Sequence, residues 1–410
     1  GLVFQQVFGI KELWGIDFFW IAAIGLVVLT ALYTIFGGMK SVLYTSVLQT
    51  PILLLGSLII LVLGFKELGG WDEMMRVCGA VTVNDYGDTM TNLIRSNDDA
   101  NFPWLGALIG SAIIGFWYWC TDQFIVQRVL SGKNEMEARR GTIFGAYLKL
   151  LPVFLFLIPG MIAFALHQKY IGAGGEGFLP MLENGTANAD AAFPTLVAKL
   201  LPAGVKGLVV CGILAALMSS LASLFNSSAM LFTIDFYKRF RPQTSEKKLV
   251  GIGQVATVVI VILGILWIPI MRSVGDVLYT YLQDVQSVLA PGIAAAFLLG
   301  ICWKRTSAQG GMWGLISGMV IGLTRLGAKV YYSNAGEVAD STFKYLFYDM
   351  NWLFFCGWMF LFCIIVVIVV SLATEAPTAE KIQGLVFGTA TKEQKASTRA
   401  SWNHWDIIHT

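Results

Sequence analysis

Charged residues are scarce in this chain. Only 13% of its 410 residues are Asp, Glu, Lys or Arg, against the ~25% usual in a soluble domain. Hydrophobic residues make up 56% of the sequence, and the mean hydropathy is +0.68. A net charge of +2 gives no signal for nucleic acid or for an acidic partner. These values exclude an ordinary soluble domain and indicate an all-α integral membrane protein.

Groups for acid–base or metal chemistry are also scarce. The three histidines are His167, His404 and His409, and none falls at mid-membrane depth. Five of the six cysteines are scattered through apolar stretches, and Cys78 stands alone in a predicted loop. This spacing suits neither a metal site nor a disulfide framework. No Gly-rich phosphate loop precedes a helix. We therefore expect neither an enzyme nor a nucleic-acid partner.

The two ends of the chain are unusual. It begins at Gly1 with no initiator methionine or signal peptide, and its first apolar stretch, 2–10, is too short to cross a bilayer. It ends in a segment, 402–408, that looks like the approach to a further helix. We expect a fragment that is cut at both ends.

Long apolar stretches dominate the rest of the sequence. Lys and Arg gather in every second loop between them, which predicts that those loops are cytoplasmic and that the first complete span runs inward. The opposite loops, such as 66–103, are expected outside, and the polar stretch 374–400 reads as a cytoplasmic linker. Hydropathy predicts nine membrane-spanning helices, near 14–36, 46–65, 104–131, 141–167, 205–233, 249–271, 277–303, 309–332 and 351–373.

Aromatic and polar side chains interrupt the third of these spans. The run 117–123 reads Trp-Tyr-Trp-Cys-Thr-Asp-Gln. Tyr118 lies ~20 Å along a span that starts at Trp104, inside a hydrocarbon core ~30 Å thick. Polar groups there cost free energy unless they face protein or water. An interfacial aromatic belt is the alternative, but the depth argues against it. The run therefore indicates the wall of a polar cavity whose rings suit stacking or gating.

Two further polar side chains lie at membrane depth. Lys149 is ~14 Å into the fourth span, where a lysine must pair or face water, although a lysine near a helix end can snorkel. Its depth matches that of Tyr118 on the preceding antiparallel span, so the two side chains can line one cavity. Gln283 lies about two turns into its helix. An interhelical hydrogen bond explains it, but the neighbouring Asp284 favours a cavity-facing stretch.

Small and hydroxyl-bearing residues gather in the fifth span. Ala216, Ser219 and Ser220 fall at i, i+3 and i+4 on one helix face, and Ser223 follows one turn later. Close helix packing through small residues explains such a stretch as well as a cation site does. Na⁺ needs several oxygen ligands, which hydroxyls and a carbonyl supply if a partner helix adds more. The residues alone leave both readings open.

Five sequence runs connect this chain to a known family. They are WYWCTDQFIVQRVL at 117–130, GAYLKLLP at 145–152, PTLVAKLLPAGVKGL at 194–208, LMSSLASLFNSSAMLFTIDFY at 217–237 and AAAFLLGICWKR at 294–305. They strongly resemble the sodium/solute symporter family, and within it the sodium–glucose cotransporter branch. The resemblance covers nearly the whole chain. It implies a leucine-transporter-type fold, in which two five-helix inverted repeats hold the binding sites at mid-membrane.

The resemblance also implies how the chain is divided. Residues 1–103 would be the remnant of the first repeat, with the end of its third helix, its fourth and fifth helices and an outer loop. Residues 104–304 would be the complete second repeat, and 305–373 two additional membrane helices. Residues 374–410 would form the cytoplasmic linker to a final helix that is missing. Helices expected before Gly1 would supply the other half of the sodium and sugar sites.

Seven residues receive roles from the resemblance. Four would contact the sugar: Tyr118 as the aromatic inner gate, Trp119 beside it, the cavity lysine Lys149 and the glutamine Gln283. Three would supply the second repeat's share of a sodium site: Ala216 through its carbonyl, and Ser219 and Ser220 through their hydroxyls.

Three positions depart from the family pattern. Ser46 stands where many relatives carry an aspartate linked to a second sodium site, and Ala222 stands where such relatives can have a serine. We therefore expect one Na⁺ per cycle rather than two. Gly115 occupies a position that is Asn or Thr in sugar transporters, so one hydrogen bond to the sugar is lost or moved.

These observations predict sodium-coupled symport of a glucose- or galactose-like monosaccharide into the cell by alternating access. The fragment alone is expected to be inactive. A symporter of another solute, such as inositol, sialic acid, proline or an anion, is the alternative, as is a non-transporting sugar sensor or ion leak. The expected location is a cell membrane, specifically a bacterial inner membrane. Sugar identity, stoichiometry, oligomeric state and host stay open.

Overall fold

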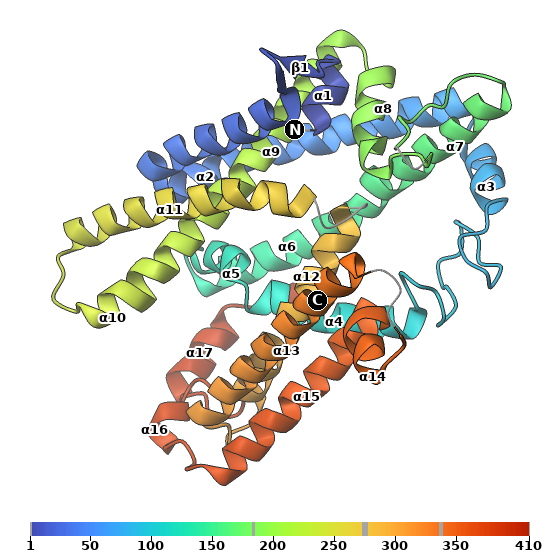
Figure 1. The fold of residues 1–410 in the computed structure, drawn as a ribbon. Coiled ribbons are helices and arrows are strands. Elements are labelled where there is room, and N and C mark those ends of the chain that lie inside the picture. Colours follow the sequence, from blue (N-terminus) through green and yellow to red (C-terminus); the bar gives the residue numbers. More distant parts are fainter. Residues whose placement is uncertain (1, 183–184, 273–277, 336–338, 410) are drawn as a thin grey trace. The chain divides into compact units, whose positions relative to one another are not determined.

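The computed structural model describes residues 2–182, 185–272, 278–335 and 339–409, and most of them are helical (Figure 1). The chain divides into two compact units, and the division falls inside one helix, α6 (Glu135–Pro152). The first unit comprises Gly1–Val81, Thr89–Thr91 and Ala146–Ser273, and the second comprises Thr82–Asp88, Asn92–Gly145 and Val274–Thr410. This division is based on contacts and does not test the predicted inverted repeats. The repeats therefore stay a prediction.

The first unit contains most of the long helices of the N-terminal half. Strands β1 and β2 form a hairpin in which Leu13 pairs with Ile16, and both turn residues, Trp14 and Gly15, have positive φ. The elements are α1 (Leu2–Phe8), β1 (Glu12–Leu13), β2 (Ile16–Asp17), α2 (Phe18–Leu68), α3 (Trp71–Gly79), the second part of α6, η1 (Val153–Leu157), α7 (Ile158–Gly172), η2 (Ala189–Ala191), α8 (Ala192–Leu200), α9 (Ala203–Met230), η3 (Leu231–Tyr237), α10 (Lys238–Phe240) and α11 (Glu246–Arg272).

The second unit combines one broken helix with the C-terminal helices. Helices α12, α13 and α15 pack against one another, and α4 packs against α12 and α15. The elements are α4 (Trp104–Cys120), α5 (Gln123–Leu130), the first part of α6, α12 (Leu278–Cys302), α13 (Ala308–Asn334), α14 (Thr342–Lys344), η4 (Tyr345–Asp349), α15 (Trp352–Ala373), α16 (Ala379–Ile382), α17 (Lys392–Ala400) and α18 (His404–Ile408).

The helices confirm a multi-pass membrane protein. Within the described residues, seven stretches are long and apolar enough to cross a bilayer, and the bent pair α4–α5 makes an eighth. The remaining predicted span, 309–332, corresponds to α13, which is long enough but is not among these stretches, and it carries Arg325 and Lys329. The seven stretches are Phe18–Ile35, Gln49–Leu68, Glu135–Gly172, Ala203–Phe240, Glu246–Pro269, Leu282–Cys302 and Trp352–Ala373.

Helix α2 contains two predicted spans without a break in its helical assignment. It is 51 residues long, which as a straight rod would measure ~77 Å, far more than a bilayer. Yet the Tyr33 hydroxyl donates to the Met218 carbonyl at 2.7 Å, while Ser46 contacts the adjacent Ser219 at 2.5 Å. Thirteen residues of straight helix cover ~20 Å. The chain therefore bends between the two stretches, so both lie against α9.

The predicted outer loop 66–103 contains a helix that the sequence reading missed. Cys78 lies in α3 and not in a loop, and it is fully buried with its thiol 3.7 Å from the Met161 carbonyl. Met74, on the same helix face, is also buried. Apolar residues four apart in an otherwise polar stretch are the signal of such an amphipathic helix. Its apolar face joins the core formed around Ile60, Ile162 and Leu166.

The predicted linker contains three short helices, α16 to α18. Two of its segments contact the start of α6. The Arg140 guanidinium pairs with Asp406 at 3.1 Å, and the hydroxyls of Ser397 and Thr398 lie 3.2 and 3.3 Å from Glu135. The linker is therefore docked within its unit rather than extended.

Candidate functional site

The aromatic run lies where a membrane helix breaks. Helix α4 ends at Cys120 and α5 starts at Gln123, with an angle of 47° between them. The Thr121 hydroxyl donates to the Trp117 carbonyl at 2.7 Å, and the Asp122 carboxylate caps α5 by accepting from the Phe124 amide at 3.0 Å. Thr and Asp thus satisfy the groups left by the break. Discontinuous helices at membrane depth are typical of binding sites in secondary transporters.

The rings of the run form a small aromatic group. Tyr118 and Trp119 meet edge to face, with centroids 5.5 Å apart and planes at 90°. Trp117 lies on the other side of Tyr118, with centroids 6.3 Å apart. Trp119 is 41% exposed and Tyr118 is partly buried. The two predicted contact residues therefore lie together, and part of the Trp119 ring is exposed.

Lys149 lies on α6 just before a change in helix type. Its side chain is exposed and belongs to the first unit. Pro152 ends α6, the π-helical turn η1 follows at once, and Pro159 is the second residue of α7. Prolines remove amide donors, so carbonyls one turn earlier lose their usual partners. Wide π-turns are frequent at functional sites.

The serine-bearing stretch lies on α9, packed closely against α2. Ser219 is 4% exposed, while Ser220 is exposed and Ala216 is partly buried. Helix packing is tight nearby, because a Cβ on Gly212 would lie 2.9 Å from the Ile52 side chain. Small residues therefore do serve close packing here. Ser219 is buried and Ser220 is exposed, so the stretch also carries one hydroxyl, that of Ser220, outside the helix contact.

The structure joins two serines that the sequence reading treated separately. The Ser46 hydroxyl, at the position where many relatives have aspartate, lies 2.5 Å from the Ser219 hydroxyl. An aspartate at this position would bring a carboxylate next to a predicted sodium ligand. With serine, the contact is between neutral groups. This observation links the departure at Ser46 to the predicted sodium residues through direct contact.

Gln283 neighbours a buried charge cluster that sequence reasoning missed. Asp284 contacts Lys329 at 2.5 Å and Arg325 at 3.6 Å, both from α13. Arg325 is fully buried, donates to the Met350 carbonyl at 2.8 Å and lies over the Phe355 ring at 4.1 Å. Two cations four residues apart in an apolar helix were the available signal, because such charges need a partner.

The predicted site residues fall in both compact units. Tyr118, Trp119 and Gln283 belong to the second unit. Lys149 and the three predicted sodium residues belong to the first. Within each unit the structure describes their surroundings, and a cavity shared by all of them stays a prediction.

Among the described residues, no group of three or more His, Cys, Asp or Glu side chains is placed to hold a metal ion. His167 is buried, and its Nδ1 accepts a hydrogen bond from the Leu179 amide at 3.0 Å. Its role is therefore structural, since it fixes the loop that follows α7.

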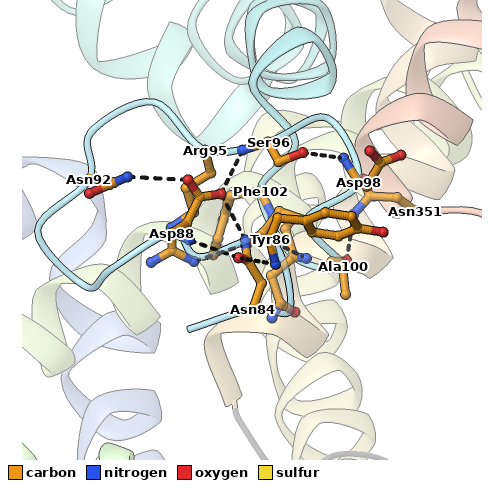
Figure 2. Close-up of polar contacts among 12 residues, drawn as sticks. Asn84, Tyr86, Asp88, Asn92, Arg95, Ser96, Asp98, Ala100, Phe102 and Asn351 are labelled. Carbon is orange, nitrogen blue, oxygen red and sulfur yellow. Dashed lines mark hydrogen bonds and ion pairs between the residues drawn. The ribbon is translucent and has the colours of Figure 1, made fainter. Parts of the chain in front are cut away.

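The outer segment 84–101 is ordered by a polar network (Figure 2). The Asn84 amide donates to Asp88 at 2.8 Å and to Asp99 at 3.0 Å. Figure 2 also shows Asn351, at the start of α15, donating to the Ala100 carbonyl at 2.7 Å. The network thus ties the segment to the first turn of α15 and fixes the approach to α4.

The two carboxylates of this network are held ionised. The Asn84 amide, followed by the Ser96 backbone amide, lowers the pKa of Asp88. Burial opposes ionisation of Asp99, but backbone amides of Phe102 and Asn101, with Asn84 and the Arg95 charge, bring its pKa below the ordinary value. Stability from lowered pKa values is present above about pH 4 and is lost as the pH falls further.

The chain is a member of a transporter family. The sequence profile of the Sodium:solute symporter family matches residues 6–318, about three quarters of the chain. The chain therefore belongs to this family. The curated relatives described below are named as cotransporters, a class of transporter and not of enzyme.

Curated relatives are about one third identical to the chain over the residues that align. The sodium/myo-inositol cotransporter 2 of Homo sapiens is 36% identical over 90% of this chain and 56% of its own length. The sodium/mannose cotransporter of Bos taurus is 36% identical over 94% of this chain and 67% of its own length. The sodium/glucose cotransporter 4 of Mus musculus is 35% identical over 94% and 58%. The chain thus spans little more than half the length of most of them.

A solved structure supports the predicted fold. It is a Na⁺-coupled sialic acid symporter in a substrate-bound outward-open state, which aligns with a TM-score of 0.65 at 20% identity. The alignment covers 92% of this chain and 71% of the symporter. It confirms an all-α, leucine-transporter-type membrane fold.

Proposed function

We propose that the protein from which this chain comes is a sodium-coupled symporter that imports a monosaccharide by alternating access. The single observation that carries the proposal is the broken helix α4–α5, which holds the partly exposed aromatic rings of Tyr118 and Trp119 at its break. Flat rings at membrane depth suit the apolar face of a sugar ring. The family membership and the relatives named for mannose, inositol and glucose support this substrate class.

Na⁺ is the proposed coupling ion. Ala216 would offer its carbonyl and Ser219 and Ser220 their hydroxyls, which are the hard oxygen ligands that such a cation needs. One positive charge moving inward gains about 2.3 kcal/mol per 100 mV of membrane potential. Ion and sugar would bind together to the outward-facing state, and a shift in population would expose them inward. Ser46, a neutral hydroxyl next to Ser219, supports one Na⁺ per cycle.

The sugar contacts proposed for this chain come from two helix breaks and one helix start. Tyr118 would stack beneath the ring, with Trp119 at its edge. Lys149 and Gln283 would donate hydrogen bonds to sugar hydroxyls. An added Cβ at Gly115 would meet nothing within 4 Å. The position therefore leaves space for sugar hydroxyls that a side chain there would fill.

Uptake by the full-length protein in proteoliposomes tests the proposal. We expect glucose or galactose accumulation that requires an inward Na⁺ gradient. The double variant Ser219→Ala, Ser220→Ala should raise the Na⁺ concentration for half-maximal uptake about tenfold or more, from lost ligands worth ~1.4 kcal/mol or more. Ser227→Ala, on the same helix with its hydroxyl on the Leu224 carbonyl, is the control. Uptake that is unchanged without Na⁺, or in the double variant, would refute the coupling.

Inositol is the second candidate substrate. The observation that favours it is the myo-inositol relative, matched over 90% of this chain. Competition between labelled glucose and unlabelled myo-inositol, mannose or galactose separates the candidates. A sensor or leak would instead give a sugar-evoked current without accumulation. Bacterial origin stays a prediction.

A further inference from the structure

A groove lies at the start of helix α6, within the second unit. It has a volume of about 680 Å³, and it is lined by the end of α5, the first turns of α6 and the C-terminal segment 402–407. This volume is in the range of pockets for small molecules, ~300–1,000 Å³. Five of its nine lining residues are apolar, and three of the others are charged. The groove therefore combines an apolar surface with a few charged groups.

Polar contacts hold the walls of this groove together. The Arg140 guanidinium donates to both Asp406 oxygens, at 3.1 and 3.4 Å. The hydroxyls of Ser397 and Thr398 donate to the Glu135 carboxylate at 3.2 and 3.3 Å. The C-terminal segment thus has a defined position beside α6. The groove is formed by these contacts and does not need a ligand to create it.

The charged and apolar parts of the groove follow one another along α6. Glu135 is the first residue of a stretch long enough to cross a bilayer, and Ile143 lies eight residues, ~12 Å, further along. Between Arg140 and Lys149 the helix has no charged residue. Lys133 and the arginines after it predict that this end of α6 is cytoplasmic. The charged end of the groove therefore lies at the cytoplasmic surface, and the apolar end extends toward the inner leaflet.

The apolar end of the groove suits a hydrocarbon chain. Thr142 donates its hydroxyl proton to the Ala138 carbonyl at 2.8 Å, so its polar group is satisfied within α6. Ile407, on the C-terminal segment, is 61% exposed. Trp402 also lines the groove, and tryptophan is enriched at membrane interfaces. Covering such apolar surface with a hydrocarbon chain gains roughly 25 cal/mol per Å².

The charged end of the groove offers both signs of charge. Arg139 and Glu135 pair at 2.9 Å with side chains 41% and 40% exposed, so both have surface that a ligand can contact. Their hydrogen bond uses one of the five N–H donors of the guanidinium, a group well suited to phosphate. Asp406 and its partner Arg140 add one charge of each sign. A headgroup with both a phosphate and an ammonium group fits this neutral set, whereas a purely anionic headgroup would meet two carboxylates.

We propose that the groove binds one zwitterionic phospholipid of the cytoplasmic leaflet. An acyl chain lies between α6 and the segment 402–407, with the phosphate at Arg139 and the ammonium group at Glu135. The order of charged and apolar groups along the groove matches the order within such a lipid. A further helix ~10 Å wide would need about 900 Å³ over ~12 Å of length, which is more than the groove holds. The proposal rests on the predicted orientation and not on the proposed substrate.

Native mass spectrometry of the purified full-length protein tests the apolar part of the groove. Ala138→Phe fills the groove with a ring, while Ala396→Phe makes the same change at an exposed position of α17 outside its lining. One phosphatidylethanolamine molecule should stay bound to the unaltered protein and to Ala396→Phe, and should be lost from Ala138→Phe. Retention by Ala138→Phe would overturn the proposal. So would the absence of bound lipid from the unaltered protein, because another segment would then fill the groove.

A lipid titration tests the headgroup without blocking the groove. Delipidated protein in detergent is titrated with phosphatidylethanolamine or phosphatidylglycerol whose acyl chains carry bromine, which quenches tryptophan fluorescence. The part of the quenching that is lost in Trp402→Phe reports on the groove. Phosphatidylethanolamine should quench Trp402 at an about fivefold lower concentration than phosphatidylglycerol, equivalent to ~1 kcal/mol.

Two charge variants complete the titration. Arg139→Gln should raise the phosphatidylethanolamine concentration for half quenching about fivefold. Lys133→Gln removes a positive charge near the same end of α6 but outside the groove lining, and it should change nothing. Equal shifts in the two variants, equal concentrations for the two lipids, or quenching that Trp402→Phe leaves unchanged would each contradict the proposed site.

Discussion

At the scale of single residues, the buried charges around Arg325 are expected to have the largest effect on stability. Arg325 has no exposed side-chain surface, and its guanidinium depends on two carbonyls, one carboxylate and one aromatic face. Asp284 in turn has two cationic neighbours. Its neighbour in the chain is Gln283, so this cluster fixes the part of α12 that carries a predicted sugar contact.

Arg325→Met should strongly destabilise the protein. The change leaves the Leu346 and Met350 carbonyls without their cationic donor and leaves Asp284 with Lys329 as its cationic neighbour. Removing one member of a buried pair costs about 3–5 kcal/mol. Thermal unfolding in detergent measures the effect. Arg76→Met, which removes an exposed pair with Glu73 on α3, should leave the midpoint unchanged. Equal midpoints for both variants would show that the buried cluster does not contribute to stability.

At the scale of elements, helices approach one another through glycine. Gly110 on α4 faces α15, where an added Cβ would lie 2.8 Å from the Leu353 carbonyl oxygen and 3.0 Å from its Cα. Backbone cannot retreat as a side chain can, so this approach requires glycine. Gly115, five residues further along α4, has open space instead. One helix therefore carries one glycine required by packing and one that is not.

The two glycines give a matched pair for an experiment. Gly110→Ala should lower the free energy of unfolding by about 1–3 kcal/mol, because the methyl group overpacks the contact with α15. Gly115→Ala should raise it by about 0.5–1 kcal/mol, since alanine loses less backbone entropy in a helix. Chemical unfolding of both variants measures the difference. A loss with Gly115→Ala as large as that with Gly110→Ala would contradict this account of the packing.

At the scale of the whole molecule, the alternation of charged loops predicts an orientation in the membrane. The segment of the outer network, 84–101, should face outward, and the loop 241–245 between α10 and α11 should face the cytoplasm.

Labelling of single cysteines in intact cells tests the orientation. Tyr86→Cys should react with a membrane-impermeant thiol reagent from outside, and Thr244→Cys only after the cells are opened. The exposed native cysteines are first replaced by serine to remove background; they are Cys120, Cys211 and Cys302. Labelling of Thr244→Cys in intact cells would show the opposite orientation.

The sequence by itself located eight of the nine spans that it predicted, because a membrane helix satisfies its backbone hydrogen bonds within its own segment. It also singled out Tyr118 and Lys149, since polar side chains at membrane depth stand out one at a time. Tertiary structure alone decided the contacts: the Ser46–Ser219 pair and the partners of Arg325. Each depends on how two helices are rotated and where they approach, and no local pattern contains that information.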